Sequence, residues 1–198
     1  MGRTVILDNG HGAVINGLYQ TAGKRSPNWE QGILYEGMFN RWVVNRIIET
    51  LDRKKVPYYH ISPEYNDVTL ETRKNRADKI YESNRNVWIL SVHANAGGGT
   101  GIEGFTTIGS TTSDQIGEIV LQNLDVDLPN IRKRFDWSDG DRDKEKDFYI
   151  LKKPKAPAFL IECGFMDNRT DYAMLWNEGY VKTLVDSLVK SIEEIYKN

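Results

Sequence analysis

The sequence predicts a single-domain α/β protein in which a mostly parallel, twisted sheet is flanked by helices on both faces. Short apolar runs alternate with longer stretches of helical periodicity, the order typical of strands joined by helices. Residues 87–92 are almost continuously apolar, as expected of a strand covered on both faces. The 198 residues are enough for one core, and no repeat, low-complexity tract or linker divides them. We therefore expect one domain over residues 1–198.

The elements of the first half alternate regularly. Apolar residues at positions 39, 43, 44, 47, 48 and 51 recur with the spacing of one helical face, and a further helix carries its apolar residues broadly on one side. A proline comes just before the second strand. The predicted elements are a strand over 5–7, a helix over 36–54, a strand over 58–61, a helix over 69–81 and a strand over 87–92.

The second half continues this order after a glycine-rich loop. Hydroxyl residues precede its first helix, where they favour the N-cap. The predicted elements are a strand over 102–108, a helix over 110–124, strands over 148–151 and 158–161, a segment over 171–176 and an amphipathic helix over 178–196. Two long loops remain. The Gly- and Asn-rich segment 9–35 is long enough to indicate a function, and the charged segment 136–147 indicates a solvated surface loop.

Composition excludes several classes of protein. Lys and Arg number 26 against 28 Asp and Glu, so the net charge is −2 and nothing indicates a nucleic-acid partner. No apolar stretch approaches the ~20 residues of a membrane span, and the first residues lack the pattern of a signal peptide. One cysteine allows no internal disulfide. We expect a monomer without an integral membrane segment.

Three predicted strands end on polar residues. They run into Asp8-Asn9-Gly10-His11, His93-Ala94-Asn95 and Glu162-Cys163-Gly164. Ligands of open α/β sheets bind just outside the carboxyl ends of parallel strands. If the strands are parallel, His11, His93 and Glu162 converge at one edge of the sheet. Two imidazoles and a carboxylate there are what a divalent-metal site requires.

A further carboxylate comes from the helix over 36–54. Continuing its apolar stripe backward by one turn reaches Glu36, which would point toward the sheet. With His11 and His93 it would complete a set of two histidines and one glutamate. That set leaves a fourth tetrahedral position for water, the arrangement of a catalytic zinc. Glu162 could then act as general base or stabilise a charged intermediate.

Each of these residues also has a simpler interpretation. Asp-Asn-Gly between apolar runs is a hairpin signal that would leave His11 a bystander, and Glu36 could serve only the helix dipole. His93 could be an interior histidine, and Asn95 could orient substrate or turn the chain. Glu162 is harder to explain without a partner because its neighbours are apolar. We expect His60 to pack in the fold or lie at the surface, and Cys163 to be a small buried packing residue.

Several ordered motifs together resemble one family. They are Leu7-Asp8-Asn9-Gly10-His11-Gly12, Ser91-Val92-His93-Ala94-Asn95-Ala96, Gly101-Ile102-Glu103-Gly104-Phe105, Phe148-Tyr149-Ile150-Leu151 and Phe159-Leu160-Ile161-Glu162-Cys163-Gly164-Phe165-Met166-Asp167-Asn168. The chain resembles, over nearly its whole length, the zinc-dependent N-acetylmuramoyl-L-alanine amidases of the amidase-3 family. That family is found in cell-wall hydrolases and phage endolysins.

The resemblance implies a function and a site. One Zn²⁺ would be bound by His11, Glu36 and His93, and Glu162 would be the catalytic glutamate, with Asn95 as a candidate substrate contact. The substrate would be peptidoglycan, cut between N-acetylmuramic acid and L-alanine. The alternatives are a zinc peptidase that cuts within the stem peptide and a module that binds the wall without cleaving it.

The resemblance leaves two biological settings. The first is a phage endolysin that accumulates in the host cytoplasm and reaches the wall at lysis. The second is a bacterial autolysin or sporulation amidase that acts at the cell wall or outside the cell. In either setting we expect no separate wall-binding module in residues 1–198.

Overall fold

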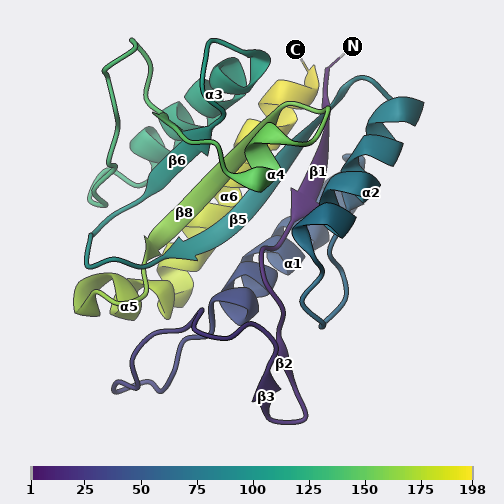
Figure 1. Cartoon of the computed structure of the whole chain (residues 1–198). Coiled ribbons are helices and arrows are strands. Elements are labelled where there is room, and N and C mark those ends of the chain that lie inside the picture. The colour runs from purple at the N-terminus through teal and green to yellow at the C-terminus, as the bar shows by residue number, and fades with distance from the viewer. Residues whose placement is uncertain (1, 198) are drawn as a thin grey trace.

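A six-stranded sheet lies at the centre of the computed structural model, which describes residues 2–197 (Figure 1). The strand order is β4 (Tyr58–His60), β1 (Thr4–Asp8), β5 (Val87–Asn95), β8 (Ala158–Phe165), β6 (Glu103–Thr106) and β7 (Lys144–Glu145). The first four strands of this order are parallel to one another, β6 is antiparallel to β8, and β7 is parallel to β6. The predicted α/β class with a mostly parallel sheet is confirmed.

Helices cover both faces of this sheet. They are α1 (Glu36–Lys54), α2 (Leu70–Ser83), α3 (Thr112–Asp127), α4 (Tyr149–Lys152), α5 (Arg169–Leu175) and α6 (Glu178–Lys197). One face packs against α1, α3 and α6, and the other against α2 and α4 (Figure 1). The chain forms a single α/β domain. Within residues 2–197, no helix is both long and apolar enough to cross a membrane.

The buried central strands fix the direction of the polar residues at their ends. Successive side chains of a strand point to opposite faces, so Trp88, Leu90 and Val92 enter the core beneath α1 and α6. Ile89 enters the smaller core beneath α2 and α4. His93 follows the same alternation as Ile89. It therefore lies on the α2 side of the sheet, beyond the end of that smaller core.

The strand predicted over 148–151 is wrong. These residues form the short helix α4, in which the backbone N–H groups of Leu151 and Lys152 donate to the carbonyl of Phe148. The side chains of Ile150 and Leu151 are buried against the same face of the sheet as α2. A four-residue apolar run has no period that separates a strand from a buried helical turn. The place beside β6 is taken by Lys144–Glu145 of the charged segment instead.

The hairpin interpretation of Asp8-Asn9-Gly10 is also wrong, because in the described part of the chain, residues 2–197, β1 pairs only with the parallel strands β4 and β5. A hairpin does occur later in the 9–35 loop, between β2 (Val14–Ile15) and β3 (Leu18–Tyr19). Its turn residues, Asn16 and Gly17, have φ of 49° and 78°. Positive φ at both positions is what a tight hairpin turn requires.

Candidate metal centre

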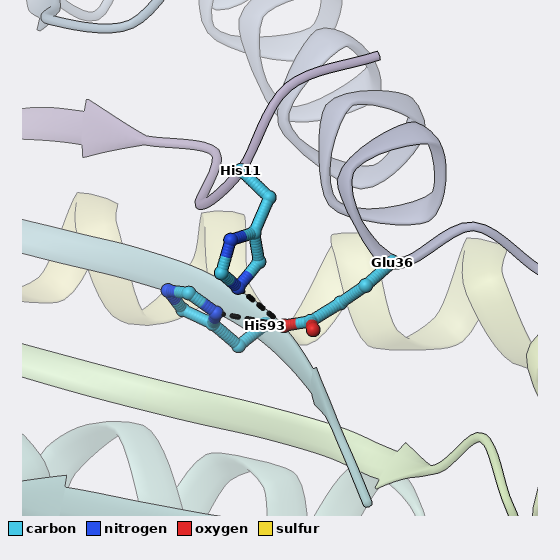
Figure 2. Close-up of side chains that lie close together, drawn as sticks. All are labelled: His11, Glu36 and His93. Atoms are coloured by element: carbon cyan, nitrogen blue, oxygen red, sulfur yellow. Dashed lines mark hydrogen bonds and ion pairs between the residues drawn. The ribbon is translucent and has the colours of Figure 1, made fainter. Parts of the chain in front are cut away.

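Three of the predicted site residues come together at the carboxyl edge of the sheet. One ligand atom from each of His11, Glu36 and His93 lies within 4.8 Å of the others (Figure 2). Oε1 of Glu36 is 3.2 Å from Nε2 of His11 and 2.9 Å from Nδ1 of His93. The two imidazole rings meet edge to face, with centroids 5.0 Å apart. Both rings thus present a nitrogen to the same carboxylate oxygen, and their assignment as metal ligands remains a prediction.

Each of the three side chains comes from a different element. Glu36 is the first residue of α1 and is only 1% exposed, in line with the buried Phe39 and Val43 of the same helix. His93 lies in β5, next to the central strand β8. His11 lies in the loop after β1 with a φ of 70°, a conformation that few residues other than glycine adopt. Such strain persists only where surrounding structure enforces it.

A buried polar network supports the His11 loop. The carboxylate of Asp8 accepts hydrogen bonds from Ser62 at 2.9 Å and Ser91 at 2.7 Å. The side-chain oxygen Oδ1 of Asn9 forms a 2.6 Å hydrogen bond with Nε2 of His60, which lies on β4. The carbonyl of Gly10 accepts a hydrogen bond from the α1 residue Asn40. The three residues before His11 are thus tied to β4, β5, α1 and the segment after β4.

Two glycines allow the close packing around this centre. A Cβ atom on Gly10 would lie 2.0 Å from Cε1 of His93, and one on Gly37 would lie 1.9 Å from the carbonyl oxygen of Gly12. The first clash is with a side chain. The second is with backbone, which has little freedom to move because the N–H of Gly12 donates to Thr21 and the N–H of Ala13 donates to the carbonyl of Tyr65.

We expect Gly37→Ala to destabilise the protein and weaken metal binding together. The methyl group would push the start of α1, which carries Glu36, away from the His11–Gly12 backbone. Overpacking of this kind costs about 1–3 kcal/mol, which is roughly 2–12 °C in Tm for a chain of this size. Thermal melts and zinc titration of the same variant measure both effects.

Gly179→Ala is the matched control for this variant. Gly179 is the second residue of α6 and follows a glutamate, as Gly37 follows Glu36 in α1. A Cβ atom there would lie 3.1 Å from the side chain of Asn177, and no backbone atom is as close. We expect this variant to keep the wild-type Tm and zinc affinity. Equal losses in both variants would contradict the proposed role of Gly37.

The electrostatics of the centre favour a bound cation. Burial alone would raise the pKa of Glu36, but the hydrogen bond with His93 and the nearby imidazole of His11 hold this pKa well below its usual range. Burial opposes the charged form of His93, yet Glu36 raises the pKa of that imidazole above its usual range. Nε2 of His11 and Oε2 of Glu36 are buried and have no hydrogen-bond partner among the residues that the structure describes. An ionised carboxylate among unsatisfied polar atoms fits a divalent metal.

Glu162 lies on β8 directly beside this group. Its Cα position pairs with that of His93 in the parallel register of β5 and β8. Burial raises the pKa of Glu162 to about 8, and its Oε2 atom is buried without a hydrogen-bond partner. A carboxyl group whose pKa lies near neutral pH can both accept and donate a proton. Its catalytic role remains a prediction.

Asn95 is the last residue of β5 and already has protein partners. Its Nδ2 donates to Glu103 at 2.6 Å, and its Oδ1 accepts from the backbone N–H of Ala96 at 2.8 Å. The side chain is therefore oriented by the protein and closes the turn after β5. Substrate contact by Asn95 stays a prediction.

The residues expected to lie outside the chemistry are packed into the fold. Cys163 is fully buried, and burial raises the pKa of its thiol well above the usual range. His60 is half-buried on β4, and burial lowers the pKa of its imidazole to about 4. Neither side chain belongs to the group formed by His11, Glu36 and His93.

Sequence reasoning missed a second polar cluster at this edge. Glu103 of β6 accepts hydrogen bonds from Asn95, Arg134 and Lys144, each at 2.6 Å. Arg134 comes from an irregular connection without periodicity, so no pattern pointed to it. The available signals were Asn95 and Glu103, an acidic residue within a predicted strand and a quoted motif.

Fold and site together define a class: an α/β protein with a candidate metal centre of two histidines and a glutamate at the carboxyl edge of its sheet. The sequence matches the N-acetylmuramoyl-L-alanine amidase family (Amidase_3) over residues 5–194. The chain therefore belongs to this family of enzymes, as the motif resemblance implied.

Individual relatives agree with this assignment. The N-acetylmuramoyl-L-alanine amidase CwlM of Bacillus licheniformis is 32% identical over 97 residues, which are 49% of this chain and 36% of the relative. An endolysin of Bacillus phage SPP1 is 26% identical over 200 residues, covering 98% of this chain and 66% of the relative. The crystal structure of an N-acetylmuramoyl-L-alanine amidase from Clostridium difficile 630 superimposes with a TM-score of 0.78 at 23% identity, covering 98% and 96% of the two chains. That likeness supports the fold.

Proposed function

We propose that this chain is a zinc-dependent amidase that hydrolyses the bond between the lactyl group of N-acetylmuramic acid and the L-alanine of the peptidoglycan stem peptide. The observation that carries the proposal is the group of His11, Glu36 and His93 within 4.8 Å, with Glu162 on the neighbouring strand. Membership of the amidase family supports the reaction and the substrate class. Two imidazoles and one carboxylate are a ligand set of hydrolytic zinc sites.

The three ligands and Glu162 would have separate tasks. His11 and His93 would hold the metal through the nitrogens that face Glu36, and Glu36 would add its carboxylate. Zinc, when bound there, supplies a Lewis acid that polarises a carbonyl group and lowers the pKa of water toward ~7. Glu162 would accept the proton of the attacking water at its free carboxylate oxygen. It would then return this proton to the leaving nitrogen of L-alanine.

The relatives support two settings for this activity equally. The phage endolysin aligns with 98% of this chain, and CwlM is an amidase of a bacterium. As an endolysin, the protein would accumulate in the host cytoplasm and reach the wall at lysis. As an autolysin or sporulation amidase, it would act at the cell wall. We also propose that residues 1–198 contain no separate wall-binding module and that the protein binds peptidoglycan at the candidate metal centre itself.

Mass spectrometry of digested peptidoglycan tests the proposed reaction. We expect muropeptides to be split into a product with a free lactyl carboxylate and a peptide with a new L-alanine amine. Stripping metal with a chelator should abolish both products, and added Zn²⁺ should restore them. Cuts within the peptide would instead identify a zinc peptidase. Wall binding without any new terminus would identify a binding module.

A further inference from the structure

We infer that Arg134, held in place by Glu103 and Phe165, forms a subsite for a carboxylate of the stem peptide. This inference rests on the proposed function, because the subsite adjoins the same candidate catalytic glutamate. It assigns a preference among peptidoglycan substrates: the enzyme should favour a stem peptide whose second residue carries a free carboxylate over one in which that group is amidated.

The position of the cluster follows from the order of the strands. Glu103 lies directly opposite Glu162 in the antiparallel register of β6 and β8. The strand order β1, β5, β8, β6, β7 therefore places the metal ligands on one side of Glu162 and the Glu103 cluster on the other. Neighbouring strands are about 4.8 Å apart, so a short peptide spans this distance easily.

Arg134 has the geometry of a carboxylate receptor. Its Nε donates to Oε1 of Glu103 at 2.6 Å, and its guanidinium carbon lies 5.5 Å from the ring centroid of Phe165. Among residues 2–197, no acceptor takes a hydrogen bond from either Nη atom. The side chain is 31% exposed. Glu103 thus fixes the Nε edge of the guanidinium and Phe165 contacts its face, which leaves the two Nη atoms available. These atoms can donate two parallel hydrogen bonds to the oxygens of one carboxylate.

The charge of the cluster favours an anionic ligand. Burial alone would raise the pKa of Glu103, but hydrogen bonds from Lys144 and Arg134 hold this pKa below its usual range. The single carboxylate of Glu103 is thus shared by two cations, since Lys144 donates to the same oxygen at 2.6 Å. One positive charge remains uncompensated within the cluster. It lies at a partly exposed edge, where an incoming carboxylate can reach it.

The chemistry of the reaction indicates which part of the substrate reaches this cluster. The carbonyl on the muramyl side must lie at the metal ligands, and the leaving nitrogen must lie beside Glu162, which protonates it. The peptide that follows this nitrogen then continues past Glu162 toward Glu103 and Arg134. The peptide carries carboxylates, whereas the N-acetylated glycan does not. A carboxylate one residue beyond L-alanine is the nearest anionic group that can reach Arg134.

Two synthetic substrates that differ in one group test this inference. They are N-acetylmuramoyl-L-alanyl-γ-D-glutamyl-L-lysinamide and the same compound with its glutamyl α-carboxylate converted to a carboxamide. For the zinc-loaded wild type we expect a KM about 10- to 100-fold lower for the carboxylate form, the size of a charged hydrogen-bond pair, with similar kcat values. In Arg134→Gln the two KM values should approach each other. Arg134→Lys, which keeps the charge but loses the planar edge, should keep part of the preference.

Arg132→Gln is the control, since Arg132 is exposed on the same connection and the substitution removes the same charge. We expect it to keep the wild-type preference. Equal KM values in the wild type, or an equal loss on both substrates in Arg134→Gln, would overturn the inference. Failure of the wild type to cut either compound would count against the proposed function instead. In that case, calorimetry of both compounds with the Glu162→Gln variant decides the inference. We expect the carboxylate form to bind this variant more tightly than the carboxamide form. Adding Arg134→Gln to the same protein should abolish that difference in affinity.

Discussion

Replacing Glu162 with glutamine is expected to lower kcat on peptidoglycan fragments by about 10²- to 10⁴-fold, the usual contribution of a general acid–base group. Glutamine keeps the shape of the side chain but cannot accept a proton from water or donate one to a leaving nitrogen. The proposed metal ligands His11, Glu36 and His93 are untouched, so we expect zinc to bind this variant as it binds the wild type. Turnover of a defined muramyl peptide and zinc content are the two measurements. Wild-type turnover in this variant would exclude Glu162 as the catalytic group.

The same variant should not lose stability, which separates a catalytic role from a structural one. In the metal-free protein, burial raises the pKa of Glu162 to about 8, far above the ~4.3 of an unfolded chain. The folded state therefore holds a proton that the unfolded state releases between these values. The wild type loses stability as pH rises from about 4 to about 8. Glutamine does not titrate.

The Tm advantage of metal-free Glu162→Gln over the metal-free wild type should thus be small near pH 4 and largest above pH 8. Melting curves of both proteins across this range measure it. A constant difference in Tm would show that the carboxyl group of Glu162 does not titrate in the folded protein as its burial implies.

The sequence was informative wherever a residue continued a regular pattern. Glu36 could be placed because it extends an apolar helical stripe, and it is indeed buried at the first position of α1. His93 and Glu162 could be placed because each follows an apolar strand, and parallel pairing aligns the ends of those strands. In these cases the period of the backbone determines the direction of a side chain.

Pattern failed where tertiary contacts decide the structure. The run 148–151 is apolar in either a strand or a helical turn, and the place beside β6 is taken by Lys144–Glu145. Arg134 lies 31 residues from Glu103, and its contact with that carboxylate depends on the path of an irregular connection. Asn-Gly does form a hairpin turn in this chain, but at Asn16-Gly17 and not at Asn9-Gly10.

Replacing Glu36 with glutamine is expected to weaken zinc binding by far more than the 10- to 100-fold that is typical of partners outside the ligand set. The change removes the only carboxylate of the group, whose Oε1 faces both His11 and His93. Glutamine retains an oxygen that can accept hydrogen bonds from neutral imidazoles, so the fold should survive. The purified variant should lose its zinc on dialysis against a mild chelator, and its activity should fall with its metal content. Excess zinc should restore part of that activity.

His60→Ala distinguishes the loss of a ligand from the loss of any nearby imidazole. His60 contacts Asn9, two residues before His11, through a 2.6 Å hydrogen bond, so its removal should lower Tm. The side chain lies outside the group of His11, Glu36 and His93, and the zinc stoichiometry should therefore stay at one. If Glu36→Gln kept full zinc affinity while His60→Ala lost it, the metal would have to lie at another place on this edge. Glu162, which faces His93 from β8, would then be the first carboxylate to test as a ligand.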